Sequence, residues 1–359
     1  MKICYFGSFQ ENYQRNQIIR KGLAENNIRI LECNIPFGMG LRFWKRYARL
    51  IAKHKSINGD YDYLLVAEMN QKNIPLAFII SRIYKKPLIF DPFISLYDSK
   101  VKDRKRVKAN SLAALKCFYW DKISLKLADL VIADTYQHLR YFKEKFGVSE
   151  DQIRVLYVGS DDAIFHSAKI RAKNSEDFTI FFYGSFVPLH GIEYIVKAAC
   201  LLKKENVHFE ILGNGQTYQE IRDLENKLQP SNMAFIPPVP IEELPYYLNK
   251  SDISLGIFGH TAKTQRVIPT KVYNSMAMGK PVITGDTPAI REVFLDRKNI
   301  LLCKCANEES LAETILELKE DQELRQEIAE TGYRLVSEKF TPKAIGLGLI
   351  EILNEFKKK

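Results

Sequence analysis

The chain has 359 residues, of which 46% are hydrophobic and 27% are charged. This length exceeds one ordinary hydrophobic core and suits two domains, and the composition excludes a disordered or low-complexity protein. The formal net charge is +10, and the excess lies in the first half. Residues 1–167 hold 28 Lys and Arg against 17 Asp and Glu, a net +11, whereas residues 168–359 hold 25 against 26, a net −1. We therefore expect the first half to meet an anionic partner.

Apolar stretches along the chain are far shorter than the roughly 20 residues that span a bilayer. A strand-like run begins at residue 3, which predicts a protein without a signal peptide. The six cysteines are scattered, and the single residue between Cys303 and Cys305 fits neither a zinc site nor a redox motif. These features predict reduced thiols in a cytoplasmic protein.

Strand and helix patterns alternate through the first half. Short runs of β-branched and aromatic residues predict strands, and segments with apolar residues at helical spacing predict helices. In chain order the predicted strands are 3–6, 29–33, 63–67, 88–90, 130–133 and 154–157, and the predicted helices are 16–25, 74–84, 113–126 and 135–146. This alternation predicts a parallel sheet with right-handed crossovers.

The same order returns after a polar segment at 167–177, which we interpret as a linker. Residues 5–9 read YFGSF and residues 182–186 read FYGSF, so the two halves open alike. The second half is expected to contain strands at 178–182, 207–212, 233–236, 253–258 and 281–284, and helices at 241–249, 271–278, 309–318 and 344–356. We predict an α/β protein of two doubly wound Rossmann-like domains, 1–167 and 178–340, which face each other across a cleft. The C-terminal helix within 341–359 is expected to pack back towards the first domain.

The stretch YGSFVPLHGIEYI, residues 183–195, joins a buried strand to a helix through glycine turns. Such a turn often receives a phosphate through backbone N–H groups and a helix N-terminus. It contains no lysine or arginine, but a loop further on carries Lys263, Arg266 and Lys271 to the start of another helix. The side chains of these three residues are expected to bind the phosphate and neutralise its charge. The alternatives are that residues 183–195 form a turn without a ligand, and that the later loop is a polar loop that holds its cations by chance.

Five segments, in order, resemble the retaining GT-B glycosyltransferases of family GT4. They are FGSFQENYQRNQIIRKGL, the stretch 128–167 with Gly159, Asp161 and Phe165, FYGSFVPLHGIEYIVKAA, ILGNG, and KVYNSMAMGKPVITGDTPAIREVF. The resemblance covers nearly the whole chain and implies an acceptor-binding first domain and a donor-binding second domain. It implies a hexosyltransferase-type enzyme that moves a sugar, with retention, from a nucleotide sugar to a glycan or lipid-linked acceptor in cell-surface polysaccharide or glycolipid synthesis. UDP is the expected nucleotide, because UDP-sugars are frequent donors in this family.

The sequence departs from this family where the donor diphosphate is expected to bind. Members often carry an arginine and a lysine where this chain has Ser185 and His190, and two glutamates where it has Arg266 and Asn274. We expect Arg266 and Lys271 to act catalytically by neutralising the diphosphate. The remaining residues expected to bind the donor are Gly184, Ser185, His190, Gly191, Gly213, Gly215, Lys263, Thr270 and Asn274. Asn274 is expected to hydrogen-bond a ribose hydroxyl, and a solvent-facing His190 is the alternative to a phosphate contact.

The acceptor is expected at the first domain. Asp91 follows the predicted strand 88–90, where family members often have a histidine, and its carboxylate is expected to act as a base or to orient the acceptor. The alternative is an aspartate that caps its own turn. Glu68, at the end of the preceding strand, is a weaker candidate. The residues expected to border the acceptor are Gly7, Ser8, Asn12 and Arg15.

Two basic stretches in the first half suggest a membrane surface. Residues 37–55 bring Leu41, Trp44, Tyr47 and Ile51 near one helical face among many cations, which is typical of a helix in an anionic membrane surface. A helix packed in the core is the alternative. Residues 100–108 hold six cations in nine positions, and a solvated loop is their alternative. Together the stretches favour a peripheral enzyme on the inner face of the cell membrane, with a polyprenyl-phosphate-linked acceptor.

Other functions remain open. A nucleotide-sugar epimerase or a phosphorylase has the same fold, and the replaced motif residues also allow a non-catalytic sugar-nucleotide-binding protein. Neither glycine turn continues as G-x-G-x-x-G, which disfavours a dehydrogenase, and the basic segments lack a nucleic-acid-reading fold. The one Asp-x-Asp triplet, Asp60-Tyr61-Asp62, precedes a strand at its amino end. We therefore expect no metal and no cofactor, because the nucleotide sugar is a co-substrate.

Overall fold

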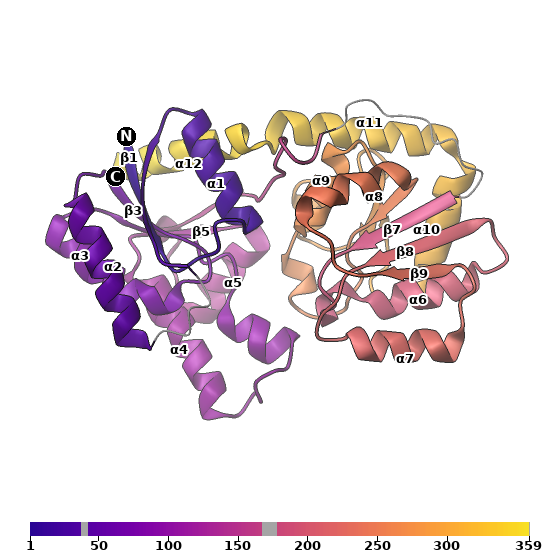
Figure 1. Ribbon diagram of the computed structural model, residues 1–359, viewed down its shortest axis with the longest axis horizontal. Coiled ribbons are helices and arrows are strands. Elements are labelled where there is room, and N and C mark those ends of the chain that lie inside the picture. Colours follow the sequence, from indigo (N-terminus) through magenta and orange to yellow (C-terminus); the bar gives the residue numbers. More distant parts are fainter. Residues whose placement is uncertain (37–41, 167–177, 359) are drawn as a thin grey trace. The chain divides into compact units, whose positions relative to one another are not determined.

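The computed structural model describes residues 1–36, 42–166 and 178–358. The chain forms two compact units, Met1–Val158 with Thr341–Lys359, and Gly159–Phe340 (Figure 1). Each unit contains a six-stranded sheet in which every pair of neighbouring strands is parallel. This confirms the predicted α/β class with two Rossmann-like domains. The segment interpreted as a linker, 167–177, lies outside the described residues.

The first unit alternates strands with helices along the chain. Its strands are β1 (Lys2–Gly7), β2 (Arg29–Asn34), β3 (Tyr63–Val66), β4 (Leu88–Phe90), β5 (Leu130–Ala133) and β6 (Ile153–Val155). Its helices are α1 (Gln14–Glu25), α2 (Phe43–Ile57), α3 (Ile74–Tyr84), α4 (Leu112–Leu127), α5 (Tyr136–Phe146) and α12 (Pro342–Lys357). The central strands are apolar throughout and fully buried, as expected for a parallel sheet covered on both faces.

The second unit repeats this plan. Its strands are β7 (Phe178–Tyr183), β8 (Val207–Leu212), β9 (Met233–Ile236), β10 (Ile253–Leu255), β11 (Val282–Gly285) and β12 (Leu301–Cys303). Its helices are α6 (Ile192–Leu201), α7 (Tyr218–Leu228), α8 (Leu244–Lys250), α9 (Thr270–Ala277), α10 (Glu308–Glu320) and α11 (Gln322–Lys339). The core lies between the sheet and helices α6 and α10.

Strand order identifies where each sheet can receive a ligand. The strand order of the first sheet is β2-β1-β3-β4-β5-β6, and the order in which strands are added reverses between β1 and β3. The order of the second sheet is β12-β11-β10-β7-β8-β9, and it reverses between β7 and β10. Ligands of doubly wound sheets bind outside the carboxyl ends of the strands at such a reversal. Gly7 ends β1 and Gly184 follows β7, so the two glycine turns of the sequence lie at these points.

Helix α12 returns to the first unit. Thr341 caps it and Pro342 occupies its first turn, and Figure 1 shows it alongside α1. Gly22 of α1 and Gly346 of α12 are so close that neither position has room for a side chain. The second unit begins at Gly159 rather than after residue 167. Within it, the Ser160 N–H donates to the Phe340 carbonyl oxygen at 2.8 Å.

Helix α2 packs against the core of the first unit. Leu50 and His54 are buried, and the Tyr47 hydroxyl donates to the Lys72 carbonyl oxygen at 2.7 Å. The predicted membrane face is therefore wrong for Tyr47, whereas Trp44 and Ile51 remain exposed. Leu41, the fourth member of that face, lies outside the described residues.

Three elements have no counterpart among the predictions, namely β12, α7 and α11. The predicted helix at 241–249 is a short 3-10 turn followed by α8, and the predicted strand at 253–258 ends at Leu255. Within residues 1–36, 42–166 and 178–358, no helix is long and apolar enough to cross a membrane.

Candidate functional site

The glycine turn after β7 is open on one side. Gly184 has a φ of 146°, in the region that glycine occupies at no steric cost. The segment after β8 supports the turn. The Phe186 N–H donates to the Asn214 carbonyl oxygen at 2.9 Å, and Gly213 lies directly against the Gly184 carbonyl. Ser185 is exposed, and no described residue accepts a hydrogen bond from its N–H. A backbone donor is therefore available at the end of β7.

Lys271 lies over this turn. It belongs to the first turn of α9, and its side chain is only 4% exposed. A methyl group added at Gly184 would lie 2.9 Å from Lys271 Nζ, which places the ammonium group beside the turn. Nζ is also 3.7 Å from the centroid of the Phe182 ring. The structure thus brings two of the predicted site residues, Gly184 and Lys271, together.

The ammonium group of Lys271 is buried without an anion. Among the residues that the structure describes, none accepts a hydrogen bond from Nζ. Burial lowers the pKa of Lys271 well below its usual range, because the charged form loses hydration and gains no carboxylate. The Phe182 ring face offsets only part of this loss. An anion that entered the turn would remove the penalty and restore the charge.

The other predicted cations occupy the loop before α9. Lys263 is buried and Arg266 is half-buried, and the 3-10 turn Thr264–Arg266 ends three residues before Pro269, which caps α9. Thr270 is the first residue of that helix. Both cations have contacts within the protein. Their roles towards a diphosphate remain predictions.

His190 and Gly215 also border the Gly184 turn. A methyl group at Gly184 would lie 3.2 Å from His190 Cε1, and the His190 ring packs edge-on against Phe182. His190 is therefore not the solvent-facing residue of the alternative interpretation. Gly215 pairs with Phe186 across the turn, whereas Gly191 directly precedes α6 and lies against the backbone of Phe258 and Gly259.

Asn274 has an internal partner. Its Oδ1 accepts a hydrogen bond from the Ser160 hydroxyl at 2.9 Å, and its side chain is buried. Ser160 lies in the G-x-D motif segment that the sequence assigns to the first domain, but it belongs to the second unit. The expected contact between Asn274 and a ribose hydroxyl remains a prediction.

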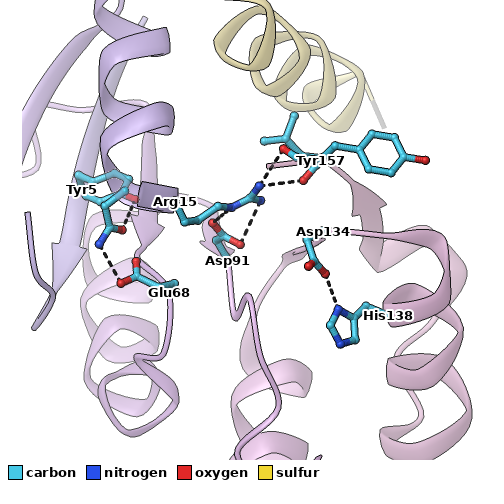
Figure 2. Close-up of polar contacts among 9 residues, drawn as sticks. Tyr5, Arg15, Glu68, Asp91, Asp134, His138 and Tyr157 are labelled. Carbon is cyan, nitrogen blue, oxygen red and sulfur yellow. Dashed lines mark hydrogen bonds and ion pairs between the residues drawn. The ribbon is translucent and has the colours of Figure 1, made fainter. Parts of the chain in front are cut away.

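The first unit carries a buried polar network at the carboxyl ends of its strands (Figure 2). Arg15 Nε donates to Asp91 Oδ2 at 2.9 Å, and its Nη1 donates to the carbonyl oxygens of Leu156 and Tyr157, each at 2.9 Å. Arg15 Nη2 reaches the second oxygen of Asp91 at 3.3 Å. Both side chains are almost fully buried. Arg15 and Asp91 thus join α1 to the ends of β4 and β6.

This pairing changes the interpretation of Asp91. The predicted base or acceptor-orienting carboxylate has both oxygens engaged by one guanidinium, and it is 1% exposed. The role of Asp91 towards an acceptor remains a prediction. Arg15, predicted to border the acceptor, is the buried partner.

Glu68 is as buried as Asp91, at 2% exposed, but its carboxylate is only partly engaged. Its Oε1 accepts from Asn16 Nδ2 at 2.8 Å, and Asn16 Oδ1 in turn accepts from the Tyr5 hydroxyl at 2.8 Å (Figure 2). Glu68 Oε2 has no hydrogen-bond partner within the described chain. Burial and the nearby Asp91 raise the pKa of Glu68 to about 8.

The residues after β1 take different positions. The Ser8 N–H donates to Asn70 Oδ1 at 2.7 Å, so this turn is closed by an amide. A methyl group on Gly7 would collide with the same Asn70 side chain. Asn12 is exposed.

A buried Asp–His pair escaped the sequence reasoning. Asp134 follows β5, His138 lies on the first turn of α5, and Asp134 Oδ1 contacts His138 Nδ1 (Figure 2). No described residue contacts His138 Nε2 through a hydrogen bond. The available signal was the Asp-x-x-x-His spacing where a helix starts directly after a buried strand.

The Asp-x-Asp triplet is engaged elsewhere. Lys2 Nζ donates to Asp60 at 2.7 Å, and the Lys2 N–H donates to Asp62 Oδ2 at 2.7 Å. The described residues contain no group of three or more His, Cys, Asp or Glu that could hold a metal ion. Metal independence remains a prediction.

Comparisons with known proteins agree with this architecture. Residues 164–335 match the family described as Glycosyl transferases group 1. The uncharacterized glycosyltransferase MJ1069 of Methanocaldococcus jannaschii is 24% identical over 325 residues, which cover 86% of this chain and 77% of that protein. HepE of Anabaena, solved in complex with UDP, has a TM-score of 0.73 at 17% identity and covers 99% of this chain with 100% of its own. Sucrose-phosphate synthase from Thermosynechococcus elongatus has a TM-score of 0.78 at 14% identity, with 99% of both chains covered.

These likenesses identify the fold as GT-B. The family match lies within the second unit, which also holds the Gly184 turn and Lys271. The chain therefore carries a glycosyl transferases group 1 domain and is a glycosyltransferase.

Proposed function

We propose that this protein transfers a sugar, with retention of anomeric configuration, from a UDP-sugar to a glycan or lipid-linked acceptor. The observation that carries the proposal is Lys271, a buried ammonium group without an anion beside the open glycine turn. A diphosphate supplies the anion that this group lacks. HepE, which shares the fold, was solved with UDP and with UDP-glucose, and this likeness supports UDP as the nucleotide.

The chemistry follows from where charge develops. When the sugar–phosphate bond breaks, negative charge accumulates on the departing diphosphate while the sugar becomes an oxocarbenium-like cation. Lys271, the Ser185 N–H and the N-terminus of α9 would stabilise that charge without a metal ion. Lys263 and Arg266, on the loop that leads into α9, would add to the positive potential.

The acceptor side is assigned to the first unit. Glu68, with a pKa of about 8, is the carboxylate best suited to accept the hydroxyl proton of an acceptor. Asp91 and Arg15 would hold the surrounding strands in place. The strongly basic first half supports an acceptor linked to polyprenyl phosphate and a peripheral location on the inner face of the cell membrane.

A thermal-shift screen with UDP-, GDP- and ADP-sugars tests the donor, because a ligand that binds only the folded protein raises its melting temperature. We expect the largest shift with a UDP-sugar. Isomerised donor in the absence of acceptor would instead indicate an epimerase, and donor binding without turnover towards any glycan or lipid acceptor would indicate a binding protein.

Two lysine variants test the site itself. Lys271→Ala is expected to lower the transfer rate by roughly 10²–10³-fold, the usual cost of removing one preorganised charge-stabilising donor. Lys280→Ala is the matched control, because Lys280 follows the same helix and donates to the Asn249 and Ser251 carbonyl oxygens. Equal rates for the two variants would contradict the assignment of Lys271.

A further inference from the structure

Helix α4 exposes an apolar face. Leu112 is 77% exposed, Leu115 and Tyr119 are each 53% exposed, and Ile123 is 44% exposed. Their spacing of three and four residues places them in one stripe along the helix. Side chains of this kind normally face the core, so the stripe requires an explanation.

The orientation of α4 is fixed by polar contacts on its opposite face. Asp121 is buried and accepts hydrogen bonds from Ser95 Oγ at 2.7 Å, the Leu96 N–H at 2.9 Å and the Tyr97 N–H at 2.8 Å. Ser124, on the same side of the helix, is also buried. The helix therefore buries Asp121 and Ser124 beside Ala114 and Leu125, and it leaves the apolar stripe on its other side exposed.

The neighbouring helix continues this character. Helix α3 packs against α4, and its Ile79 and Ile83 are 55% and 69% exposed. These isoleucines are one helical turn apart and therefore share a face of α3. Two adjacent helices of the first unit thus expose large aliphatic side chains.

The same region is strongly positive. The segment directly before α4 has exposed cations at Lys100, Lys102, Lys105, Arg106 and Lys108. Helix α4 adds exposed Lys116 and Lys126. All four carboxylates between residues 69 and 128 are buried, namely Asp91, Asp98, Asp103 and Asp121. Residues 69–128 hold 13 Lys and Arg against these four Asp, a net +9, so the region carries an excess of positive charge.

We propose that the apolar stripe of α4, with the lysines around it, docks on an anionic lipid bilayer. Leu112, Leu115, Tyr119 and Ile123 would enter the acyl boundary, and the basic segment 100–108 would meet the phosphate head groups. Lysines can extend to the head groups while their aliphatic stems remain on the apolar surface. The proposal rests on the lipid-linked acceptor proposed above, and it assigns the membrane surface to α4 rather than to the predicted helix within 37–55.

Charge decides between a bilayer and a second copy of the chain. If two α4 faces met, two regions of net positive charge would be brought together, which is unfavourable. An anionic lipid surface supplies the missing charge together with an apolar interior. A bilayer therefore fits both features of the face.

Vesicle sedimentation of the full chain tests this surface. We expect binding to vesicles of phosphatidylcholine mixed with phosphatidylglycerol, little binding to phosphatidylcholine alone, and a decline as salt screens the lysines. The triple variant Leu115→Ser/Tyr119→Ser/Ile123→Ser should weaken binding roughly tenfold or more. The matched control is Leu201→Ser/Tyr246→Ser/Leu295→Ser, which removes three equally exposed side chains from the second unit and should bind as the unmodified chain does.

A charge pair separates the two contributions. Lys105→Ala/Lys108→Ala should weaken binding to the anionic vesicles roughly tenfold, whereas Lys203→Ala/Lys204→Ala, which removes exposed lysines of the second unit, should not. The α4 triple variant should retain the thermal shift with UDP-sugar, so a failed membrane proposal is distinguishable from a failed donor site. Equal binding of both triple variants would overturn the proposal. The proposal would also be overturned if the α4 triple variant bound vesicles normally but changed the molecular mass of the protein in solution. The α4 face would then be an interface between copies of the chain.

Discussion

The two units present the same glycine turn and close it differently. Gly7 after β1 and Gly184 after β7 both have a φ of 146°. In the first unit Asn70 covers the turn, and its Oδ1 accepts the Ser8 N–H at 2.7 Å. In the second unit the corresponding space holds the ammonium group of Lys271. The same backbone is thus combined with a neutral acceptor in one unit and with a cation in the other.

The backbone donor of the first turn has a hydrogen-bond acceptor in the protein, whereas that of the second turn has none among the described residues. The Ser8 N–H is satisfied by the protein, so the first turn requires no ligand. The Ser185 N–H and Lys271 Nζ are both donors, and no described residue accepts from either of them. An anion satisfies the Ser185 N–H and a protonated Lys271 at once, because both can donate to it.

The buried cations show the same contrast. Arg15 is surrounded by a carboxylate and two carbonyl oxygens, so it stabilises the fold only while those partners remain. Lys271 is surrounded by aromatic rings and a glycine turn. Its charge therefore works against folding until a ligand arrives.

The largest effect is expected from Arg15→Leu. This change leaves Asp91 buried without its partner and should lower the free energy of unfolding by about 3–5 kcal/mol. Urea denaturation measures the difference. Arg20→Leu is the control on the same helix, since its partly exposed pair with Glu32 should contribute only about 0–1 kcal/mol. Similar losses for the two variants would show that the buried pair is not special.

The two glycine turns can be compared directly by Gly7→Ala and Gly184→Ala. Each change should lower the free energy of unfolding by about 1–3 kcal/mol, because alanine is strained at this φ. Only Gly184→Ala displaces Lys271, so it alone should weaken UDP-sugar binding, by roughly tenfold. Calorimetric titration of both variants checks this, and an equal loss of affinity would remove the distinction between the turns.

Glu68→Gln tests the first unit through pH. The pKa of Glu68 is about 8 in the folded protein, above its ordinary value of 4.5. The folded state therefore binds the extra proton between these two values, and stability falls as pH rises through that window. At pH 9 the variant should exceed the unmodified chain by about 4 kcal/mol in the free energy of unfolding. Towards pH 4 this advantage should disappear, and parallel curves would contradict the assigned pKa.

Lys271→Met should have a smaller effect of the opposite sign to Arg15→Leu. Removal of an unpaired buried ammonium group should raise the free energy of unfolding, without donor, by about 1 kcal/mol. The pKa of Lys271 is lowered in the folded state, so the unfolded state binds more protons between that pKa and 10.5. The advantage of the variant should therefore be largest at low pH and shrink as pH rises. A destabilised variant would mean that Lys271 has a partner in the fold.

Features that depend on neighbouring residues in the sequence could be predicted, whereas contacts between residues far apart in the sequence could not. Strands such as β3 and β5 are short apolar runs between helices, so periodicity predicted them. Helices α7 and α11 are largely polar and were not predicted. The cation at Lys271 was predicted because it lies at a helix start after a basic loop. The pairing of Arg15 with Asp91 joins residues 76 positions apart, and no local pattern reports it. The same holds for the amide of Asn70 that closes the first turn.

Proton uptake on donor binding tests the central claim most directly. A diphosphate that enters the Gly184 turn should raise the pKa of Lys271 and draw a proton from solution. Calorimetric titration with UDP-glucose at mildly alkaline pH, in buffers of different ionisation enthalpy, should therefore show uptake approaching about one proton per donor. Lys271→Met should abolish the uptake. Donor binding with no proton uptake, or with the same uptake in Lys271→Met, would show that the diphosphate binds elsewhere.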